Sequence, residues 1–292
     1  TGAFAAEYGN ALSGVFDLQL RKGNNEKKEY TAQAGILGLN LAVEGPFSKK
    51  YKGSYLINYR YSTLSILSTL GLSFTPSITQ FQDLSYNIFL PTKRFGNFSL
   101  FSFGGLSNQY YNVVIDSTKW KNESEKYGDR FVSNTGVWGA THQINLGKNH
   151  LVKTAIAYAT MQNAYNRNYV QENYQMLNVY NQKNTIRKVT LSSTMNQRLH
   201  TRAMLRSGII ATNFIIDYNE QIREKIHSDL KSLVNAKNQT QTIQAFSQLQ
   251  YKFTDNITLL GGLHYIQLLL NNTKSLEPRA SIKWDMHTKH SL

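Results

Sequence analysis

Residues that could carry chemistry are scattered along this chain of 292 residues. There are seven histidines, and only His287 and His290 lie close together, in an expected turn without a third ligand at metal spacing. The chain has no cysteine, which excludes disulfides, thiolate metal sites and cysteine nucleophiles. The residue types therefore predict no metal site and no cofactor.

Catalytic patterns are missing as well. No serine stands in a nucleophile-elbow context, and no pair of carboxylates is indicated. The glycine pairs Gly104-Gly105 and Gly261-Gly262 fall in the middle of expected strands, where glycine indicates a bulge or bend and not a phosphate loop. We therefore expect no catalytic residue, and a protein that is not an enzyme.

The charge balance is strongly basic, with a formal net charge of +14 from 32 Lys+Arg and 18 Asp+Glu. Nucleic acid, a phosphate-rich membrane surface and an anionic solute are three partners that such a charge fits. The basic residues are dispersed over connections, as at Lys93-Arg94, and form no basic helix or ribbon. Nucleic acid is therefore not an expected partner.

Composition leaves two classes of all-β protein open. The chain is 41% hydrophobic and its mean hydropathy is −0.41. No run approaches the roughly 18 apolar residues that a membrane helix needs. A soluble β protein would look like this, and so would a transmembrane β-barrel, whose strands are apolar on one face only.

Period-2 alternation predicts about twelve strands. In 53–64, for example, Tyr55, Ile57 and Tyr59 alternate with Asn58 and Arg60. In a membrane barrel the first three would face lipid and the other two the lumen, and Ile282 and Trp284 would also face lipid. The expected strands are Tyr30–Ile36, Leu39–Phe47, Gly53–Leu64, Phe81–Leu90, Asn97–Asn108, Phe131–Leu146, His150–Tyr165, Thr185–Gln197, Ala203–Tyr218, Thr240–Phe253, Ile257–Leu270 and Glu277–His287. Alternation is poor in Ala203–Tyr218, and the sequence leaves the faces of that strand undecided.

Short and long connections alternate between these strands. Ser65–Gln80, Gln109–Arg130, Asn166–Asn184 and Asn219–Gln239 are long, and the links between them are short. An up-and-down membrane barrel has short turns at one end and long loops at the other, whereas a Greek-key sandwich has no reason to keep this order. Within the last long link, apolar residues at helical spacing predict a short helix in Glu220–Ala236, and Ser62–Leu72 is expected to end in a helical turn.

The first residues, GAFAAEYGNALSGVFDLQLRKG, combine small residues and glycines with an alternating strand that ends at Arg21. This stretch resembles the end of the plug domain of TonB-dependent outer-membrane receptors, in the branch with a carboxypeptidase-regulatory-like N-terminal extension. By this resemblance Glu7, Tyr8, Gly9, Gly14 and Arg21 match the terminal motif of the plug. Their expected role is plug folding and contact with the barrel.

The resemblance implies the fold class and the domains. It implies an all-β protein: an antiparallel up-and-down transmembrane β-barrel, partial, preceded by the C-terminal end of a plug domain. The plug end and hinge would occupy 1–28 and the partial barrel 29–292. Family barrels have about 22 strands, so the chain is expected to be a fragment with open edges at Tyr30–Ile36 and Glu277–His287. The first residues lack the basic and apolar stretches of a signal peptide, which fits the same expectation.

The resemblance also implies function and partners. It implies ligand-gated import of an external solute across the outer membrane of a Gram-negative cell, energised through TonB. Expected partners are outer-membrane lipid and lipopolysaccharide, TonB through an N-terminal segment missing from this sequence, and a surface lipoprotein. The solute itself is not indicated, because siderophores, cobalamin, oligosaccharides and peptides are all substrates of the family.

Two sets of residues are candidates for contact with that solute. Aromatic residues in or beside the long links suit ligand contact, although loop-to-loop packing is the stronger explanation for any one of them; they are Tyr110, Tyr111, Trp120, Tyr165, Tyr169, Tyr174 and Tyr180. Cations expected to face the lumen would attract an anionic solute, or pair with acidic plug residues; they are Arg60, Lys188, Lys252, Arg279 and Lys283.

Two other functions remain open at this stage. One is a passive, porin-like outer-membrane barrel, against which the plug-like first residues argue. The other is a soluble β-rich domain that binds carbohydrate through its tyrosines. Dependence on detergent distinguishes the soluble domain from the two membrane proteins, and a complete plug upstream of Thr1 distinguishes a receptor from a passive barrel.

Overall fold

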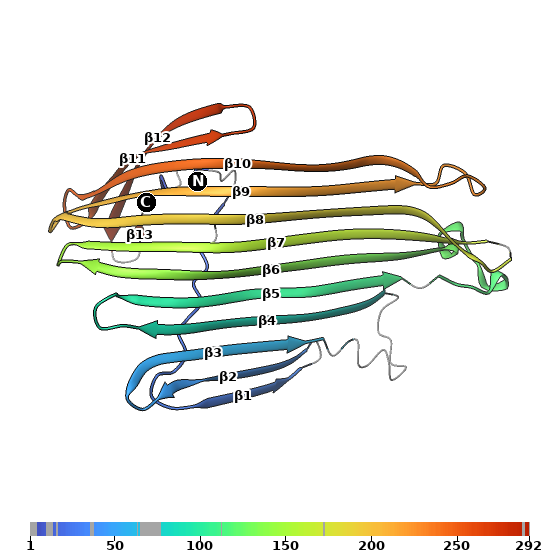
Figure 1. Cartoon of the computed structure of the whole chain (residues 1–292), viewed down its shortest axis with the longest axis horizontal. Helices are drawn as coiled ribbons and strands as arrows, with labels where there is room; N and C mark the ends of the chain where they lie inside the picture. The colour runs from blue at the N-terminus through green and yellow to red at the C-terminus, as the bar shows by residue number, and fades with distance from the viewer. Residues whose placement is uncertain are drawn as a thin grey trace.

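The computed structural model describes residues 5–9, 14–15, 17–35, 38–62, 64, 77–111, 113–171, 173–287 and 290–291. The described strands form one antiparallel sheet in which each strand pairs with the next along the chain (Figure 1). The all-β, up-and-down fold expected from the alternation is therefore confirmed. The elements are β1 (Glu29–Ala34), β2 (Leu39–Ser48), β3 (Tyr51–Tyr61), β4 (Ser77–Pro91), β5 (Asn97–Tyr111), η1 (Ser117–Lys119), η2 (Glu123–Lys126), β6 (Tyr127–Leu146), β7 (His150–Val170), β8 (Met176–His200), β9 (Ala203–Ile222), β10 (Lys231–Lys252), β11 (Ile257–Leu268), β12 (Thr273–His287) and β13 (His290–Ser291).

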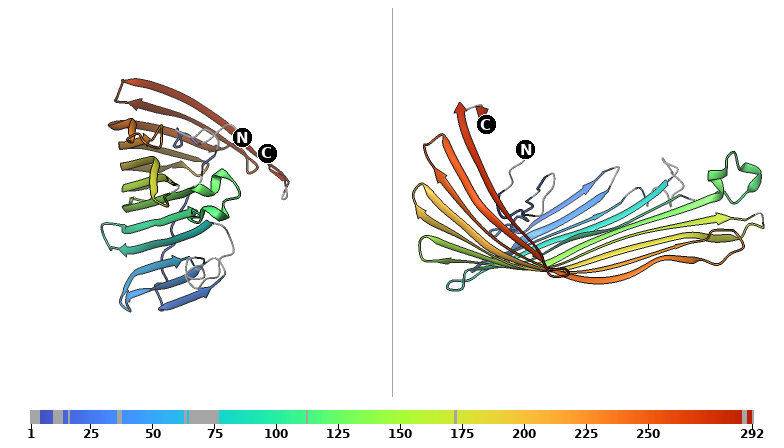
Figure 2. Two further views of the ribbon diagram at one scale, coloured as in Figure 1. Left: turned by 90° about the vertical axis from the view of Figure 1, so that its right-hand side faces the viewer. Right: turned by 90° about the horizontal axis from the view of Figure 1, so that it is seen from above.

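The sheet is an open, curved wall. Its strands follow an arc from β1 to β12, and the N-terminal segment runs on the concave side (Figure 2). Within the described part of the chain, no pairing joins β1 to β12 or β13. β1 is an edge, as expected, but the end of β12 is not, because Asp285 and His287 pair with the two residues of β13.

Contacts with the N-terminal segment define the two faces of the sheet. We call the inner face the one from which Glu44, Asn87, Arg206, Gln248 and His264 reach that segment. All other strand positions follow from register, because alternate residues point to opposite faces.

Register places polar residues of the first strands on the inner face. Arg60 pairs with Asp83 and Leu56 with Asn87, so Arg60 and Asp83 share the face of Asn87. Tyr59 and Leu84 lie opposite each other on the outer face, where 37% and 45% of their surfaces are exposed. This is the orientation that the alternation predicts, and Ile282 and Trp284 on β12 follow it.

The strands β6 to β10 are longer than the sequence indicates, with 20 to 25 residues each. The expected loop Asn166–Asn184 is wrong for this reason: β7 continues to Val170 and β8 begins at Met176. Side-chain amides stabilise this extension, since Asn166 donates to Asn181 and Asn181 to Asn178. The polar residues of 166–184 therefore make amide hydrogen bonds in paired strands, and most of the segment is not a loop.

The expected helix in Glu220–Ala236 is also wrong. β9 continues to Ile222, and β10 begins at Lys231 with a register shift between Ser232 and Val234. From Lys231 onward, pairing with β9 satisfies the backbone without a helix. The apolar side chains that suggested a helix do not form a common buried face, since Ile226 and Leu233 are 44% and 48% exposed. The helical turn expected in Ser62–Leu72 lies almost wholly outside the described residues.

Connections still differ between the two ends of the sheet. At one end they are short, as in residues 147–149 and 201–202, and at the other the 112–126 link carries η1 and η2. We call these the short-turn end and the long-link end. No helix among the described residues is long and apolar enough to cross a membrane.

Candidate functional site

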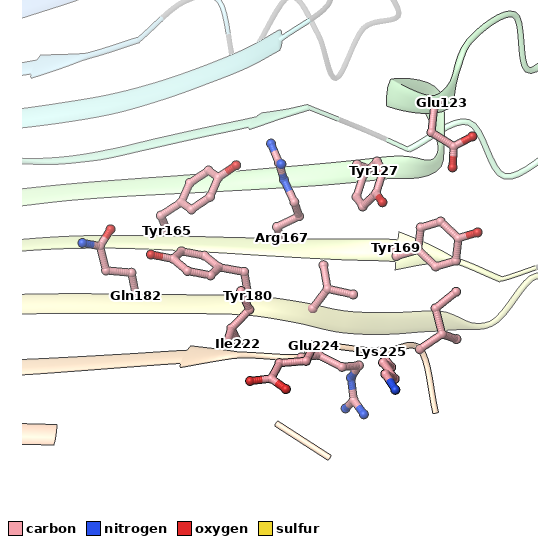
Figure 3. Close-up of a pocket in the computed structure, with 13 residues that line it drawn as sticks. Glu123, Tyr127, Tyr165, Arg167, Tyr169, Tyr180, Gln182, Ile222, Glu224 and Lys225 are labelled. Carbon is pink, nitrogen blue, oxygen red and sulfur yellow. The ribbon is translucent and has the colours of Figure 1, made fainter. Parts of the chain in front are cut away.

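A cavity of about 630 Å³ opens on the inner face at the long-link end of β6 to β9. Tyrosines and cations from neighbouring strands line it, as Figure 3 shows for Tyr165, Arg167 and Tyr180. The rings pair across strands: the centroids of Tyr127 and Tyr169 are 5.3 Å apart, and those of Tyr165 and Tyr180 are 5.8 Å apart. We call this cavity the tyrosine pocket.

One side of the tyrosine pocket is organised by Asp129. Arg167 donates to both carboxylate oxygens of Asp129 at 2.7 and 3.0 Å, and the hydroxyl of Tyr165 donates to it at 2.8 Å. These groups lie well past the roughly 9–11 residues by which a tilted strand crosses a membrane from the short-turn end. The hydrogen bond from Arg167 lowers the pKa of Asp129, while burial and then the bond to Asp129 raise the pKa of Tyr165.

The other side is organised by Glu220. The hydroxyls of Tyr180 and Tyr218 donate to its two oxygens at 2.7 and 2.9 Å, and Gln182 donates to the Tyr218 hydroxyl at 2.9 Å. The bond to Glu220 raises the pKa of Tyr180 to about 12, and the same bond lowers the pKa of Glu220. Both acids therefore stay ionised and both tyrosines neutral at physiological pH.

These networks decide what the pocket can do. The hydroxyls of Tyr165 and Tyr180 already donate to carboxylates, so their ring faces are the groups left for a ligand. Arg223 donates to the carbonyls of Asn178 and Ser228, which position its charge without neutralising it. The Lys225 ammonium has no acidic partner among the residues that the structure describes. The pocket thus combines aromatic surface with positive charge at its rim.

Three of the seven aromatic candidates from the sequence, Tyr165, Tyr169 and Tyr180, line this pocket. The other four do not. Register puts Tyr110 on the outer face, where its hydroxyl accepts from Gln80, and Tyr111 is half-exposed at the end of β5. Trp120 and Tyr174 pack in links, the first through a bond to the Val114 carbonyl and the second near the Ser117 hydroxyl.

Sequence reasoning missed several lining residues, among them Tyr127, Arg167, Gln182 and Arg223. The signal for Arg167 was present: Tyr165, Arg167 and Tyr169 keep period-2 spacing beyond the expected end of their strand. Tyr127 had no local signal, because its partner Tyr169 lies on another strand.

The five candidate lumen cations are spread over β3, β8, β10 and β12, and the structure does not gather them into one site. Three have acidic partners within the sheet: Arg60 pairs with Asp83, Arg279 with Glu277 and Lys283 with Asp285. Lys188 lies 5.3 Å from the centre of the Phe214 ring. Lys252 has no acidic partner among the described residues.

At the opposite side of the inner face, the N-terminal segment is held by its backbone. Gln248 accepts from the Ala6 amide at 2.7 Å, and the His264 imidazole is 2.6 Å from the Ala6 carbonyl. Arg279 donates to the carbonyls of Ala5 and Tyr8 at 3.1 and 3.0 Å. We call this arrangement, together with the ion pair between Arg206 and Glu7, the anchor site.

The anchor site is closely packed. Ala6 and His264 are fully buried. A Cβ on Gly9 would lie within 2.3 Å of the His264 ring, and a Cβ on Gly262 would lie 2.8 Å from that of Ala6. Only glycine at these positions lets the segment approach the sheet so closely. From the sequence, His264 was expected to be one of several scattered histidines without a site. Its contact with Ala6, more than 250 residues away, leaves no local pattern in the sequence.

A second attachment lies beneath β2 to β4. Arg21 donates to both oxygens of Glu44 at 2.7 and 2.6 Å, and Glu44 also accepts from the Asn24 amide. Asn87 donates to the Arg21 carbonyl at 2.9 Å. A Cβ on Gly23 would lie 2.0 Å from the Tyr55 carbonyl oxygen, whereas one on Gly14 would meet nothing within 4 Å. The segment is therefore attached at both sides of the curved sheet.

The described residues offer no candidate metal site. Among the residues that the structure describes, no group of three or more histidine, aspartate or glutamate side chains could hold a metal ion. The chemistry of both sites is hydrogen bonding, ion pairing and aromatic contact.

Comparison with known proteins shows the fold. No protein-family model matches the sequence, and no curated protein matches it. A mutant of the ferric enterobactin receptor PfeA from Pseudomonas aeruginosa superposes with a TM-score of 0.62 at 14% identity, covering 99% of this chain and 46% of that one. The pyoverdine outer membrane receptor FpvA from the same organism gives 0.68 at 10%, covering 94% and 46%. The ferric-catecholate import receptor Fiu from E. coli K12 gives 0.58 at 10%, covering 91% and 51%.

These structures are receptors, which fits the expectation that the chain is not an enzyme. The chain spans about half the length of each of them. Its curved, up-and-down sheet with a segment on the concave side thus has the fold of part of a TonB-dependent outer-membrane receptor.

Proposed function

We propose that this chain is part of an active-transport receptor of the Gram-negative outer membrane, which imports an external solute when TonB supplies energy. Residues 5–28 are then the end of the plug and its hinge, and β1 to β12 are part of the barrel. The observation that carries the proposal is the N-terminal segment, which crosses the inner face and is attached on both sides of it. A passive barrel has no need of such a segment.

The bonds of the anchor site suit a segment that must be released from the sheet during transport. At the anchor site the sheet holds backbone carbonyls and an amide of Ala5 to Tyr8 through few, specific bonds. Each bond to a charged side chain contributes about 1.5–3 kcal/mol when it is protected from water. A mechanical pull from the periplasm would break them one after another.

The tyrosine pocket is the proposed place of solute contact. It lies on the same inner face but at the long-link end, which in this orientation is exposed to the outside. Ring faces of Tyr165 and Tyr180 would stack on a flat part of the solute, and Lys225 with Arg223 would attract a negative group on it. The solute is thus proposed to be anionic in part.

Cysteine labelling tests the transport proposal, because the chain has no cysteine of its own. Ala6→Cys in the full-length receptor places a thiol where the native side chain is fully buried, and Gly14→Cys places one at an exposed position. In living cells whose outer membrane has been made permeable, a maleimide that does not cross the inner membrane should label Ala6→Cys only when TonB is present and the inner membrane is energised. Gly14→Cys should be labelled in all conditions. Equal labelling of Ala6→Cys with and without TonB would contradict the proposal.

Conductance distinguishes the receptor from a passive barrel. The full-length protein in a planar bilayer should be closed to ions, because the plug fills the lumen. A steady open conductance of the unmodified protein would instead support the porin-like alternative.

A further inference from the structure

The turns at the short-turn end carry an unbalanced positive charge. Of the turns that the structure describes there, those at residues 49–50, 92–96, 147–149 and 201–202 contain lysine or arginine, and the turn at 253–256 contains their one acid, Asp255. The turns stand in a row along one end of the sheet, at the left in Figure 1. We call the cations of these turns the basic rim; they are Lys49, Lys50, Lys93, Arg94, Lys148 and Arg202.

The basic rim has no acid to neutralise it. Its six side chains are exposed, and none forms an ion pair within the described part of the chain. The links at the other end of the sheet differ, because Lys119 pairs with Asp116 at 3.2 Å. Lys231 likewise pairs with Glu224 at 2.8 Å. The cations of the rim are therefore free to bind an anion outside this sheet.

Backbone hydrogen bonds hold the turns of the rim in a fixed shape. The Thr92 amide donates to the Gly96 carbonyl at 2.9 Å, and the Arg198 amide donates to the Asn149 carbonyl at 2.9 Å. Gly96 and Gly147 have φ of 77° and 74°, which glycine adopts without strain. Neighbouring turns are two strands apart, or about 10 Å along the sheet. The rim thus presents positive charge at a repeated spacing.

The outer face next to these turns is apolar. Register puts Phe98, Leu146, Leu249 and Tyr251 at its last positions, where 38% to 52% of their surfaces are exposed. Phe253 follows Tyr251 by two residues and is 61% exposed. Lipid beside the sheet therefore meets apolar side chains, and the basic rim lies beyond the ends of the strands, facing what is below the membrane.

We propose that the basic rim docks the receptor on the peptidoglycan layer, through ion pairs with the carboxylates of the peptide chains in that layer. The inference rests on the proposed function only in that it takes the short-turn end to face the periplasm. Peptidoglycan is a polymer that carries one carboxylate-bearing peptide on each disaccharide, and a disaccharide is similar in length to the separation of the turns. An exposed ion pair contributes about threefold in affinity, and pairs formed by one rigid row act together.

Sedimentation with purified peptidoglycan sacculi tests the inference. The full-length receptor is held in phosphatidylcholine nanodiscs, which leave its short-turn end accessible, and is mixed with insoluble sacculi that have been digested with protease. The rim triple takes one cation from each of three turns and is Lys93→Gln, Lys148→Gln and Arg202→Gln. The matched control makes the same charge change at exposed lysines toward the long-link end and is Lys121→Gln, Lys183→Gln and Lys237→Gln.

The unmodified receptor and the control triple should sediment with the sacculi, and their binding should weaken as salt rises from about 0.05 to about 0.3 M. The rim triple should bind roughly thirtyfold more weakly. Sacculi whose carboxylates have been converted to neutral amides should bind none of the three proteins. Equal binding by the rim triple, an equal loss in the control triple, or full binding to amidated sacculi would overturn the inference.

Two other anionic partners are outcomes of the same experiment. Binding to undigested sacculi that is absent after protease digestion would assign the basic rim to a protein attached to the peptidoglycan. Displacement of the receptor from sacculi by vesicles of phosphatidylglycerol would assign it to lipid head groups. Either result would overturn the inference.

Photo-cross-linking in cells provides a second measurement that does not depend on the folding of the triple variant. A photoreactive amino acid in place of Asn149, beside Lys148, should hold the full-length receptor on sacculi that are boiled in detergent, whereas one in place of Asn235 on β10 should not. No cross-link at Asn149, together with the labelling of Ala6→Cys expected for transport, would overturn this inference alone. A cross-link at Asn149, together with equal labelling of Ala6→Cys with and without TonB, would contradict the transport proposal alone.

Discussion

The anchor site and the tyrosine pocket occupy the same inner face but are built in opposite ways. In the anchor site, side chains of the sheet hold the backbone of another segment, and two of the residues involved, Ala6 and His264, are fully buried. In the tyrosine pocket, side chains hold one another, and the rings remain open to the cavity. The first arrangement fixes a part of the chain in place, and the second leaves a prepared surface free for something else.

The two sites differ in which groups accept the hydrogen bonds of their arginines. The guanidinium of Arg279 donates to two backbone carbonyls of the segment and to Glu277. The guanidinium of Arg167 donates to Asp129, which belongs to the sheet itself. Removing a residue of the anchor site should therefore release the segment, whereas removing one from the pocket should alter ligand binding and leave the segment in place.

The largest effect is expected from Gly23→Ala. The new methyl group would lie 2.0 Å from the Tyr55 carbonyl oxygen, and backbone on both sides cannot give way. Overpacking of this kind costs about 3 kcal/mol, so residues near Gly23 should become sensitive to protease in the folded, full-length protein. Gly14→Ala is the control, because nothing lies within 4 Å of its Cβ position. Equal protease resistance of the two variants would show that the second attachment is not as close as described.

The next effect is expected from Arg279→Ala. It removes the charged donor from the Ala5 and Tyr8 carbonyls, of which Ala5 keeps its bond from the Tyr8 amide, at a cost of about 2–3 kcal/mol. Hydrogen exchange in residues 5–9 should increase, while exchange around the tyrosine pocket stays unchanged. The pocket variant Arg167→Ala should do the reverse. If both variants changed exchange in both regions, the two sites would not be independent.

A smaller effect is expected at the rings of the pocket. Tyr165→Ala and Tyr180→Ala should each weaken binding of the transported solute by about tenfold, because a stacking surface is lost. Tyr165→Phe and Tyr180→Phe keep the rings and should bind within about threefold of the unmodified receptor. Calorimetry with the solute that an uptake assay identifies measures both series. A loss in the Phe variants as large as in the Ala variants would mean that the hydroxyls contact the solute.

The smallest effect concerns pH. Asp129 and Glu220 have folded-state pKa values below those of ordinary carboxyls, so their contribution to stability is fully present above about pH 4 and is lost as the pH falls through the lowered values. Hydrogen exchange at the long-link ends of β7 and β8 should thus be constant from pH 7 to about pH 5 and increase only in stronger acid. In Glu220→Gln, the pKa of Tyr180, about 12 in the unmodified protein, should fall towards about 10, as tyrosine NMR would show.

How much the sequence predicts differs between the two sites for physical reasons. Alternation is a local property, so the order of the strands and the faces of Tyr59, Arg60 and Trp284 could be predicted. The lengths of β6 to β10 could not, because Asn, Gln and Tyr pairs across strands support extended backbone where single-strand composition indicates a loop. The helix expected in Glu220–Ala236 was wrong for the same reason.

Long-range contacts set the remaining limit. The first residues suggested a role for Glu7, Tyr8 and Gly9, yet nothing near His264 or Arg206 in sequence shows that they are the partners. Arg279 was expected to face the lumen and to attract an anionic solute or pair with an acidic plug residue. It is instead bonded to carbonyls of the segment and to Glu277. Such pairings appear only when the sheet brings β9 to β12 together around residues 5–9.

The most direct test of the central claim is a disulfide between Ala6→Cys and Gly262→Cys in the full-length, otherwise cysteine-free receptor. The Cβ positions of these residues are 2.8 Å apart. The Cβ atoms of an ordinary disulfide are about 3.8 Å apart, so the bond forms once the segment shifts by about 1 Å away from the sheet. In intact cells the pair should oxidise and abolish solute uptake until a reductant restores it, whereas Ala6→Cys with Leu263→Cys, whose side chain lies on the outer face, should not cross-link. Absence of the Ala6–Gly262 cross-link, or uptake that continues while the cross-link is intact, would contradict the claim that this segment is seated on the inner face and must be released for transport.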